Sequence, residues 1–160
     1  MTLDAPTVGG ENDSAGAERI KVIFIDTGAD ARSPMAEALL RRDGHDRFEV
    51  VSAGVTPRGI DPLAVAAMSA VGLDLGDATS NPVGAFLGKR FDYVITLCDK
   101  ARVTCPVFPG GKQTLHWGLD DPSEVEGTDA QRRAAFDRAL KEVSSRIRTF
   151  VPFALSVAQQ

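Results

Sequence analysis

The chain has 160 residues, of which 43% are hydrophobic and 25% are charged, a composition typical of one globular domain with a substantial core. Its formal net charge of −4 argues against nucleic acid as the main partner, and no apolar run approaches the roughly 20 residues that cross a bilayer. The two cysteines, in a sequence without the basic and apolar regions of a signal peptide, predict a reducing cytoplasmic location.

Strands and helices are predicted to alternate after a polar N-terminal segment. We expect residues 1–18 to be a disordered tail, because they are rich in Gly, Asp, Glu and Ala, and residues 19–160 to form a single domain. Strands are expected over 20–25, 48–52, 91–97 and 114–117, and helices after Ser33-Pro34, Asp61-Pro62 and Thr128. The alternation predicts an α/β fold, a four-stranded parallel sheet with helices on both faces.

The segment between the first strand and the first helix has the pattern of an anion-binding loop. It places several backbone N–H groups at a helix N-terminus, and an arginine that can fold back onto a phosphate-like anion with parallel hydrogen bonds. Its residues are Asp26, Thr27, Gly28, Ala29, Asp30, Ala31, Arg32 and Ser33. A cysteine at position 26 would make this a thiolate phosphatase or reductase loop, but the chain has Asp26 there.

The loop and six further motifs resemble the low-molecular-weight tyrosine phosphatase superfamily and, more narrowly, the thioredoxin-coupled arsenate reductases. These motifs are residues 22–40, Val51-Ser-Ala-Gly54, Pro57-Arg-Gly59, Asp61-Pro62, Val94-Ile-Thr-Leu-Cys-Asp99, Cys105-Pro-Val-Phe-Pro109 and His116-Trp-Gly-Leu-Asp-Asp-Pro122. The resemblance runs from about residue 20 to residue 151, so it implies the phosphatase fold for nearly the whole chain after the tail.

The resemblance also implies roles for individual residues. In the reductases a loop cysteine attacks arsenate, a second cysteine attacks the adduct and releases arsenite, and a third resolves the disulfide that thioredoxin reduces. Cys98 and Cys105 resemble the second and third cysteines, Arg32 resembles the anion-binding arginine, and Asp121 resembles the general acid. Asp26 takes the place of the first cysteine.

No cofactor or metal is expected. A potassium site of some reductases uses residues that resemble Glu37 and Ser52, but its other positions correspond here to Ala29 and Asn81. The family also favours Asn at the position of Ala29 and a small residue at that of Asp30.

A carboxylate at position 26 changes the chemistry of the loop, because it lacks the nucleophilicity of a thiolate and cannot form the disulfide that carries two electrons to arsenate. Asp26 and Asp30 also place negative charge in the loop. Two unit charges about 4 Å apart repel by about 4 kcal/mol at an effective dielectric constant of 20. We expect the Asp26 carboxylate to occupy the loop N–H groups itself and to pair with Arg32.

Three functions are compatible with these residues. The first is a homologue without its nucleophile that binds or regulates in the arsenic or redox response, with arsenate, arsenite or phosphate as ligand and thioredoxin as partner. The second is an active arsenate reductase or tyrosine phosphatase of the family's usual type. The third is phosphoryl chemistry at Asp26. Residues 26–30 also spell the active loop of aspartic proteases, but that chemistry needs two aspartates on a β-rich dimer.

Several candidate residues have a purely structural alternative. Cys98 and Cys105 are interpreted either as an exchangeable dithiol or soft-ion site, or as two inert thiols. Asp121 is either an acid or a turn residue before Pro122, and His116 and Trp117 are expected to pack and form hydrogen bonds rather than to act as ligands.

Overall fold

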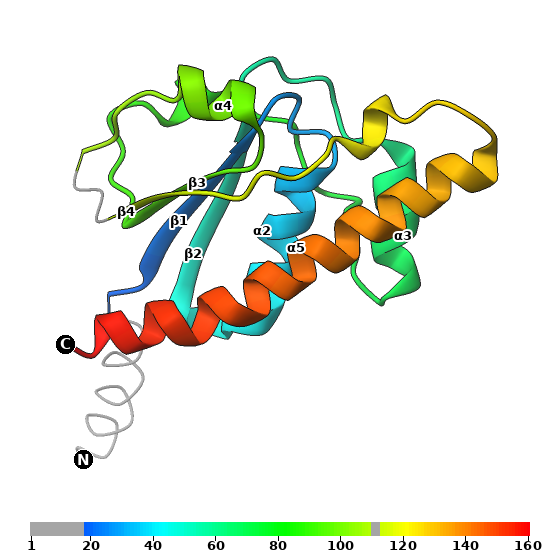
Figure 1. Cartoon of the computed structure of the whole chain (residues 1–160). Coiled ribbons are helices and arrows are strands. Elements are labelled where there is room, and N and C mark those ends of the chain that lie inside the picture. Colours follow the sequence, from blue (N-terminus) through cyan, green and yellow to red (C-terminus); the bar gives the residue numbers. More distant parts are fainter. Residues whose placement is uncertain (1–17, 110–112) are drawn as a thin grey trace, which may run out of the picture.

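The computed structural model describes residues 18–109 and 113–160, which form one four-stranded parallel sheet in the order β2-β1-β3-β4 (Figure 1). The strands are β1 (Ile20–Asp26), β2 (Phe48–Gly54), β3 (Tyr93–Thr96) and β4 (Gln113–His116). All four predicted strands are present, with ends that differ from the predicted ones by at most two residues. The inner position of β1 directs its carboxyl end, and the loop that follows it, to the middle of one sheet edge.

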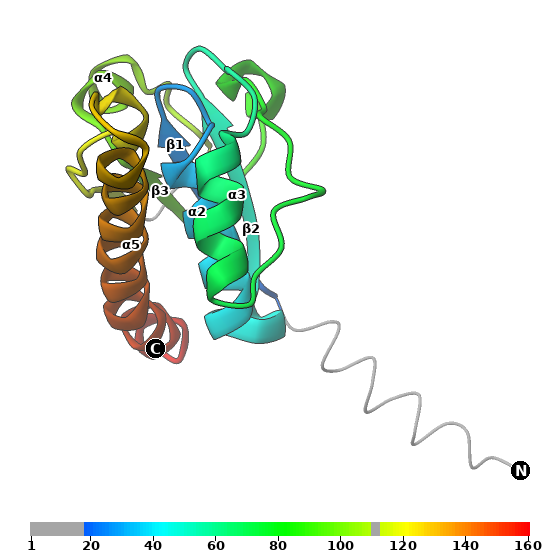
Figure 2. The ribbon, with the colours of Figure 1, turned by 90° about the vertical axis from the view of Figure 1, so that its right-hand side faces the viewer.

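Helices cover both faces of the sheet, as the sequence predicted. Figure 2 shows α2, α3 and α5 together on one face, and α4 packs on the other face against β1 and β3. The α-helices are α2 (Arg32–Gly44), α3 (Pro62–Ala70), α4 (Asp99–Thr104) and α5 (Asp129–Ala158), and the short 3-10 helices are η1 (His45–Arg47), η2 (Val83–Phe86) and η3 (Pro122–Glu124). The fold class is therefore confirmed as α/β.

The alternating side chains of β1 divide the core into two layers. Val22 and Phe24 pack in the larger cluster with residues of α2 and α5, and Ile23 and Ile25 pack in the smaller cluster below α4. All four side chains are completely buried, which explains why β1 has an unbroken apolar sequence. Phe150 of α5 closes the larger cluster, with ring centroids 5.1–6.4 Å from four other aromatic rings.

Local sequence signals set most helix ends. Asp61 caps α3 by accepting a hydrogen bond from Leu63 N, and Pro62 is the first residue of that helix. Thr128 and Gln131 form the predicted capping box of α5. The apolar stripe of α5 is buried, as expected, at Phe136, Leu140, Val143, Ile147 and Phe150.

The predicted start of α2 is wrong. This helix begins at Arg32, with Ala31 as an N-cap that makes no side-chain hydrogen bond, and Pro34 is therefore its third residue. Ser33 does not cap the helix, because its hydroxyl donates instead to the Asp26 carboxylate.

The expected disordered tail, residues 1–18, lies outside the described residues apart from Glu18, which belongs to no helix or strand. Within the described part of the chain, no helix has the length and apolar character needed to cross a membrane.

Candidate functional site

The Asp26 carboxylate fills the centre of the loop that joins β1 to α2. Its Oδ1 accepts hydrogen bonds from Ala29 N at 2.7 Å and from Ser33 Oγ at 3.0 Å, and its Oδ2 accepts one from Ser33 N at 2.9 Å. The side chain is completely buried. The predicted occupation of the loop N–H groups by the loop's own carboxylate is therefore present in the structure.

Opposing effects act on the ionisation of Asp26. Burial is the largest and raises the pKa of this carboxyl above its ordinary value of 3.8, because the charged form loses its water. The charge of Arg32 and the hydrogen bonds from Ser33 and Ala29 lower the pKa, but they do not offset burial. Asp26 in this site therefore binds its proton more tightly than an exposed aspartate does.

The backbone of the loop is bent tightly around this carboxylate. Ala29 has φ of +49°, a left-handed conformation that is uncommon for a residue other than Gly or Asn. A Cβ on the neighbouring Gly54 of β2 would come within 2.7 Å of Ala29 N. Glycine at position 54 therefore allows the loop to lie directly on β2.

Arg32 and Asp121 meet beside the loop, although 89 positions separate them in the chain. Arg32 Nη2 lies 3.3 Å from Asp121 Oδ2, and Arg32 Nη1 donates to Leu119 O at 2.9 Å. Both side chains are buried, with 2% and 8% of their surfaces exposed. The two residues that the family resemblance singled out thus lie together beside the loop. The expected direct pairing of Arg32 with Asp26 is wrong, because the guanidinium is turned toward the Leu119–Asp121 segment.

Arg58 completes the charged cluster, and sequence reasoning gave it no role. Its Nη2 lies 2.9 Å from Asp30 Oδ2 and 3.1 Å from Asp121 Oδ2, so one half-exposed guanidinium bridges two buried carboxylates. Ser123 Oγ donates to Asp30 Oδ2 at 3.0 Å. The side chain of Arg58 also covers Gly28, where an added Cβ would collide with it. The Pro57-Arg-Gly59 motif was the only signal in the sequence.

Counting these groups explains the electrostatics of the site. Three carboxylates, Asp26, Asp30 and Asp121, face two guanidiniums, Arg32 and Arg58. When all three acids are ionised, the cluster carries one net negative charge, where an oxyanion-binding loop would need positive charge.

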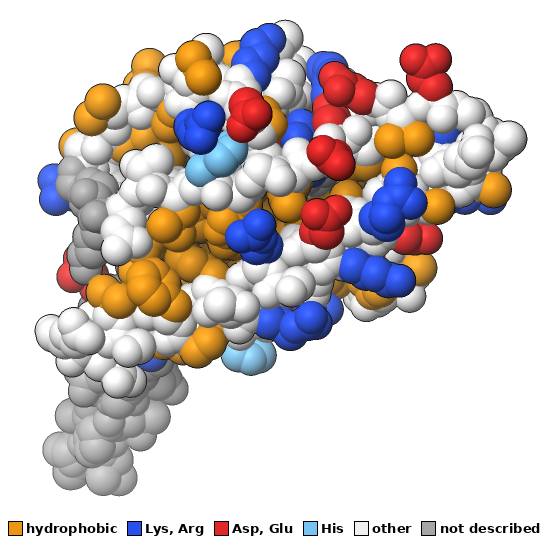
Figure 3. Space-filling view, in the orientation of Figure 1, with side chains coloured by type: hydrophobic (Ala, Val, Ile, Leu, Met, Phe, Trp, Pro, Cys, Tyr) orange, Lys and Arg blue, Asp and Glu red, His pale blue; other side chains and the backbone are white. Residues whose placement is uncertain are grey.

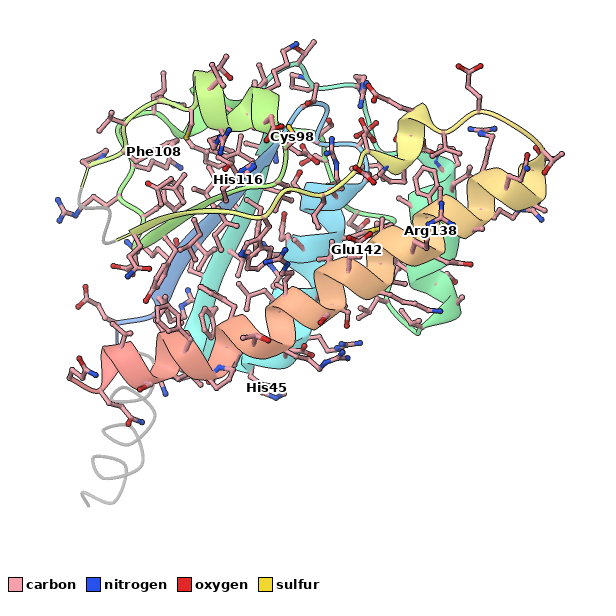
Figure 4. The ribbon with its side chains drawn as sticks, in the orientation of Figure 1. His45, Cys98, Phe108, His116, Arg138 and Glu142 are labelled. Carbon is pink, nitrogen blue, oxygen red and sulfur yellow. The ribbon has the colours of Figure 1, made fainter. Side chains whose placement is uncertain are left out.

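Cys98 lies next to the loop. Its Sγ is 3.1 Å from the hydroxyl of Thr27, and it caps α4 by accepting a hydrogen bond from Ala101 N at 3.4 Å. The Cys98 side chain is labelled in Figure 4, at the start of α4. The Cys98 sulfur therefore contacts the residue that directly follows Asp26 in the loop.

Cys105 follows the other end of α4. Its Sγ donates to Pro106 O at 3.4 Å, and burial raises the pKa of its thiol. A helical rise of about 1.5 Å over the seven steps from Cys98 puts the Cα atoms roughly 10 Å apart, beyond the limit of about 7 Å for a disulfide. A disulfide between Cys98 and Cys105 therefore requires α4 to unwind.

His116 and Trp117 have the structural contacts that were expected of them. His116 Nδ1 lies 2.8 Å from Thr96 Oγ1, and its Nε2 lies 3.0 Å from Asp99 Oδ1. Trp117 is buried against Phe24 and Phe150.

Comparison with known proteins decides the family. The model of the low molecular weight phosphotyrosine protein phosphatase family matches residues 21–160. The chain belongs to this family.

Among curated relatives of this phosphatase-family protein, the arsenate reductase of Halalkalibacterium halodurans is 40% identical over 129 residues, which cover 81% of this chain and 93% of the relative. The arsenate reductase of Bacillus subtilis is 36% identical over 129 residues, with the same coverage. A solved arsenate reductase in the phosphate binding state superposes with a TM-score of 0.72 at 28% identity, covering 83% of this chain and 97% of that one. The thioredoxin-dependent arsenate reductase of Corynebacterium glutamicum gives 0.57 at 28% identity, over 91% and 71%.

The family predicted from the motifs is thus confirmed, and arsenate reductases are its relatives. Their names agree better with an active arsenate reductase than with the impaired homologue that the Asp26 chemistry led us to expect first.

The residues around Glu37 do not fit the potassium site that the resemblance to some reductases suggested. Glu37 Oε1 accepts a hydrogen bond from Ser52 Oγ at 2.7 Å, and Glu37 Oε2 pairs with Arg41 at 2.7 Å, so both oxygens of this carboxylate already have partners. Ala29 supplies no side-chain oxygen. Within the described residues, no group of three or more His, Cys, Asp or Glu side chains is arranged to hold a metal.

Proposed function

We propose that this protein is a cytoplasmic arsenate reductase-type protein, with Cys98 and Cys105 as a dithiol that thioredoxin regenerates from its disulfide. In this proposal the first step of the usual reductase cycle is missing, so the protein binds or regulates in the arsenic response rather than turning over arsenate at position 26. The observation that carries the proposal is the seating of the Asp26 carboxylate on Ala29 N and Ser33 N.

The chemistry of the loop explains why the first step of the reductase cycle is absent. The carboxylate occupies the N–H groups that an oxyanion would use, and it has no sulfur to form an adduct or a disulfide. Asp26 is also a poor candidate for phosphoryl acceptance, because both of its oxygens accept hydrogen bonds and the side chain is completely buried.

A second candidate is an active arsenate reductase that begins at Cys98, and two observations favour it. The Cys98 sulfur contacts Thr27 of the loop at 3.1 Å, and the relatives described above are named arsenate reductases. In this reaction the Cys98 thiolate displaces hydroxide or water from arsenate and forms an S–As bond. The Cys105 thiolate then attacks Cys98, the S–S bond forms, and the As–S electron pair leaves with arsenic as arsenite.

One experiment separates the two candidates: arsenate-dependent NADPH oxidation in the presence of thioredoxin and thioredoxin reductase. Under the first candidate the unmodified protein shows no arsenate reduction and no aryl-phosphate hydrolysis. Asp26→Cys alone restores little, since Asp30 remains, and the triple variant Asp26→Cys, Ala29→Asn, Asp30→Ser restores anion binding and some turnover.

Arsenate reduction by the unmodified protein that is lost in Cys98→Ser and kept in Asp26→Ala would establish the second candidate instead. The same activity in Cys98→Ser would contradict both candidates. Cys105→Ser tests the second candidate further, because without Cys105 the S–S bond cannot form, arsenite is not released and turnover should stop.

A further inference from the structure

We propose that His116 is a positioning residue for the Cys98–Cys105 dithiol: through Asp99 it ties the first turn of α4 to the sheet and so restrains the oxidation of the two thiols. This inference rests on the dithiol of the proposed function. Within the described part of the chain, the side chains of His116 and Asp99 form no hydrogen bond or ion pair with the Asp26 loop or with either sulfur.

The ring of His116 is fixed on the rigid side of the contact. His116 and Thr96 are paired residues of β4 and β3, and the buried Thr96 hydroxyl lies 2.8 Å from His116 Nδ1. This contact leaves the Nε2 atom facing α4. Figure 4 shows His116 below the start of this helix, near Cys98.

Asp99 is the movable side of the contact. It is the first residue of α4, directly after Cys98, and 82% of its side chain is exposed. Its Oδ1 lies 3.0 Å from His116 Nε2, and Arg102 lies 3.9 Å from the same oxygen. In Figure 3 a pale blue histidine lies at the surface beside an acidic and a basic side chain in this region. The exposed acid is therefore held by a half-buried histidine of the sheet.

The position of this contact makes it relevant to the dithiol. Cys98 and Cys105 lie at the two ends of a six-residue helix, and a helix this short is marginal without tertiary contacts. The disulfide requires α4 to unwind, which would carry Asp99 away from His116. The contact therefore stabilises the dithiol relative to the disulfide, and its removal favours oxidation.

The test is the equilibrium of the full-length protein with glutathione. In this exchange Cys98 and Cys105 lose two electrons and two protons and gain an S–S bond, and one glutathione disulfide becomes two thiols. Exposed pairs of this kind change equilibria about two- to fivefold. We expect His116→Ala to raise the oxidation constant by that factor, which makes the reduction potential about 9–21 mV more negative at 29.6 mV per tenfold change.

Three variants distinguish positioning from general stability. His116→Gln, which retains a donor near the place of Nε2, should recover part of the shift. Asp99→Asn should change the oxidation constant less in the His116→Ala background than alone, because the two residues act through one contact. Glu49→Gln, which breaks a remote exposed pair with Arg19 at 3.6 Å, should leave it unchanged.

Three results would overturn the inference. If His116→Ala leaves the oxidation constant unchanged, or if the effects of His116→Ala and Asp99→Asn simply add, His116 does not restrain α4. If no variant forms the disulfide at all, the dithiol of the proposed function is wrong, and the role of His116 is rejected with it.

Discussion

Removing the Asp26 carboxylate should turn the loop into an anion site, and Asp26→Ala tests this directly. The substitution leaves Ala29 N, Ser33 N and Ser33 Oγ without their present acceptor. Buried donors without a partner cost about 1–3 kcal/mol each. An oxyanion that enters the vacated space would satisfy the same donors.

The charge count gives the size of the effect. When all three acids are ionised, the cluster of three carboxylates and two guanidiniums changes from a net charge of −1 to 0 in Asp26→Ala, and to +1 when Asp30→Ser is added. A unit charge about 6 Å from a monoanion contributes about 2.8 kcal/mol at an effective dielectric constant of 20, which is about a hundredfold in affinity. We therefore expect weak phosphate binding by the single variant and binding about a hundredfold tighter by the double variant.

Thermal unfolding with increasing phosphate measures this binding without any turnover. At a phosphate concentration one hundred times the Kd, the double variant gains about 2.7 kcal/mol. For a domain of this size, 1 kcal/mol shifts Tm by about 2–4 °C, so Tm should rise by about 5–11 °C. The unmodified protein should show no phosphate-dependent shift, and Asp46→Ala, which removes an exposed carboxylate from η1, is the control for net charge.

A phosphate-dependent rise in the unmodified protein equal to that of the double variant would refute the reasoning, since it would show that the Asp26 carboxylate does not occupy the anion site. An unresponsive double variant with an intact fold would refute the charge argument.

Three further outcomes are expected. Burial raises the pKa of Asp26 above the 3.8 of the ordinary carboxyl, so its contribution to the free energy of unfolding is complete below about pH 3.8 and is lost as the pH rises through the folded-state pKa. Urea unfolding at several pH values should show this decline, and Asp26→Ala should lack it. Phe150→Ala should lower the free energy of unfolding by about 3–5 kcal/mol, against about 1 kcal/mol for loss of the capping box in Thr128→Ala. Since burial raises the pKa of Cys105, its thiol in a Cys98→Ser variant should react more slowly with iodoacetamide at pH 8 than an unperturbed model thiol, and equal rates would contradict this.

The sequence predicted the features of this fold that depend on short-range patterns. The unbroken apolar run of β1, the Asp61-Pro62 start of α3 and the capping box at Thr128 each follow from neighbouring residues, and each is present. The start of α2 was predicted wrongly because of another short-range contact. The Ser33 hydroxyl can bond either to the helix N-terminus or to the buried carboxylate of Asp26, and in the structure it donates to Asp26.

The candidate site was predictable in its first loop but not beyond it. That Asp26 would accept the loop N–H groups follows from the loop alone, because donor and acceptor are three to seven residues apart. The partners of Arg32 come from residues 119–121, and Arg58 reaches two acids in different segments. Nothing in the spacing of the sequence fixes such contacts, which depend on how the loops after β2 and β4 pack together.

The two acids of the loop each have their own internal donors, and this pattern bears on function. Asp26 is bound by backbone N–H groups and Ser33, and Asp30 by Arg58 and Ser123. In an anion-binding loop without its ligand, such donors face solvent or the backbone is strained. Here most of these donors are satisfied without a ligand, so an anion that enters must displace a carboxylate from each set. The free-energy cost of that displacement, and not only the loss of one nucleophile, would prevent this protein from turning over arsenate. For the same reason, a substitution at position 26 without one at position 30 should restore little arsenate reduction.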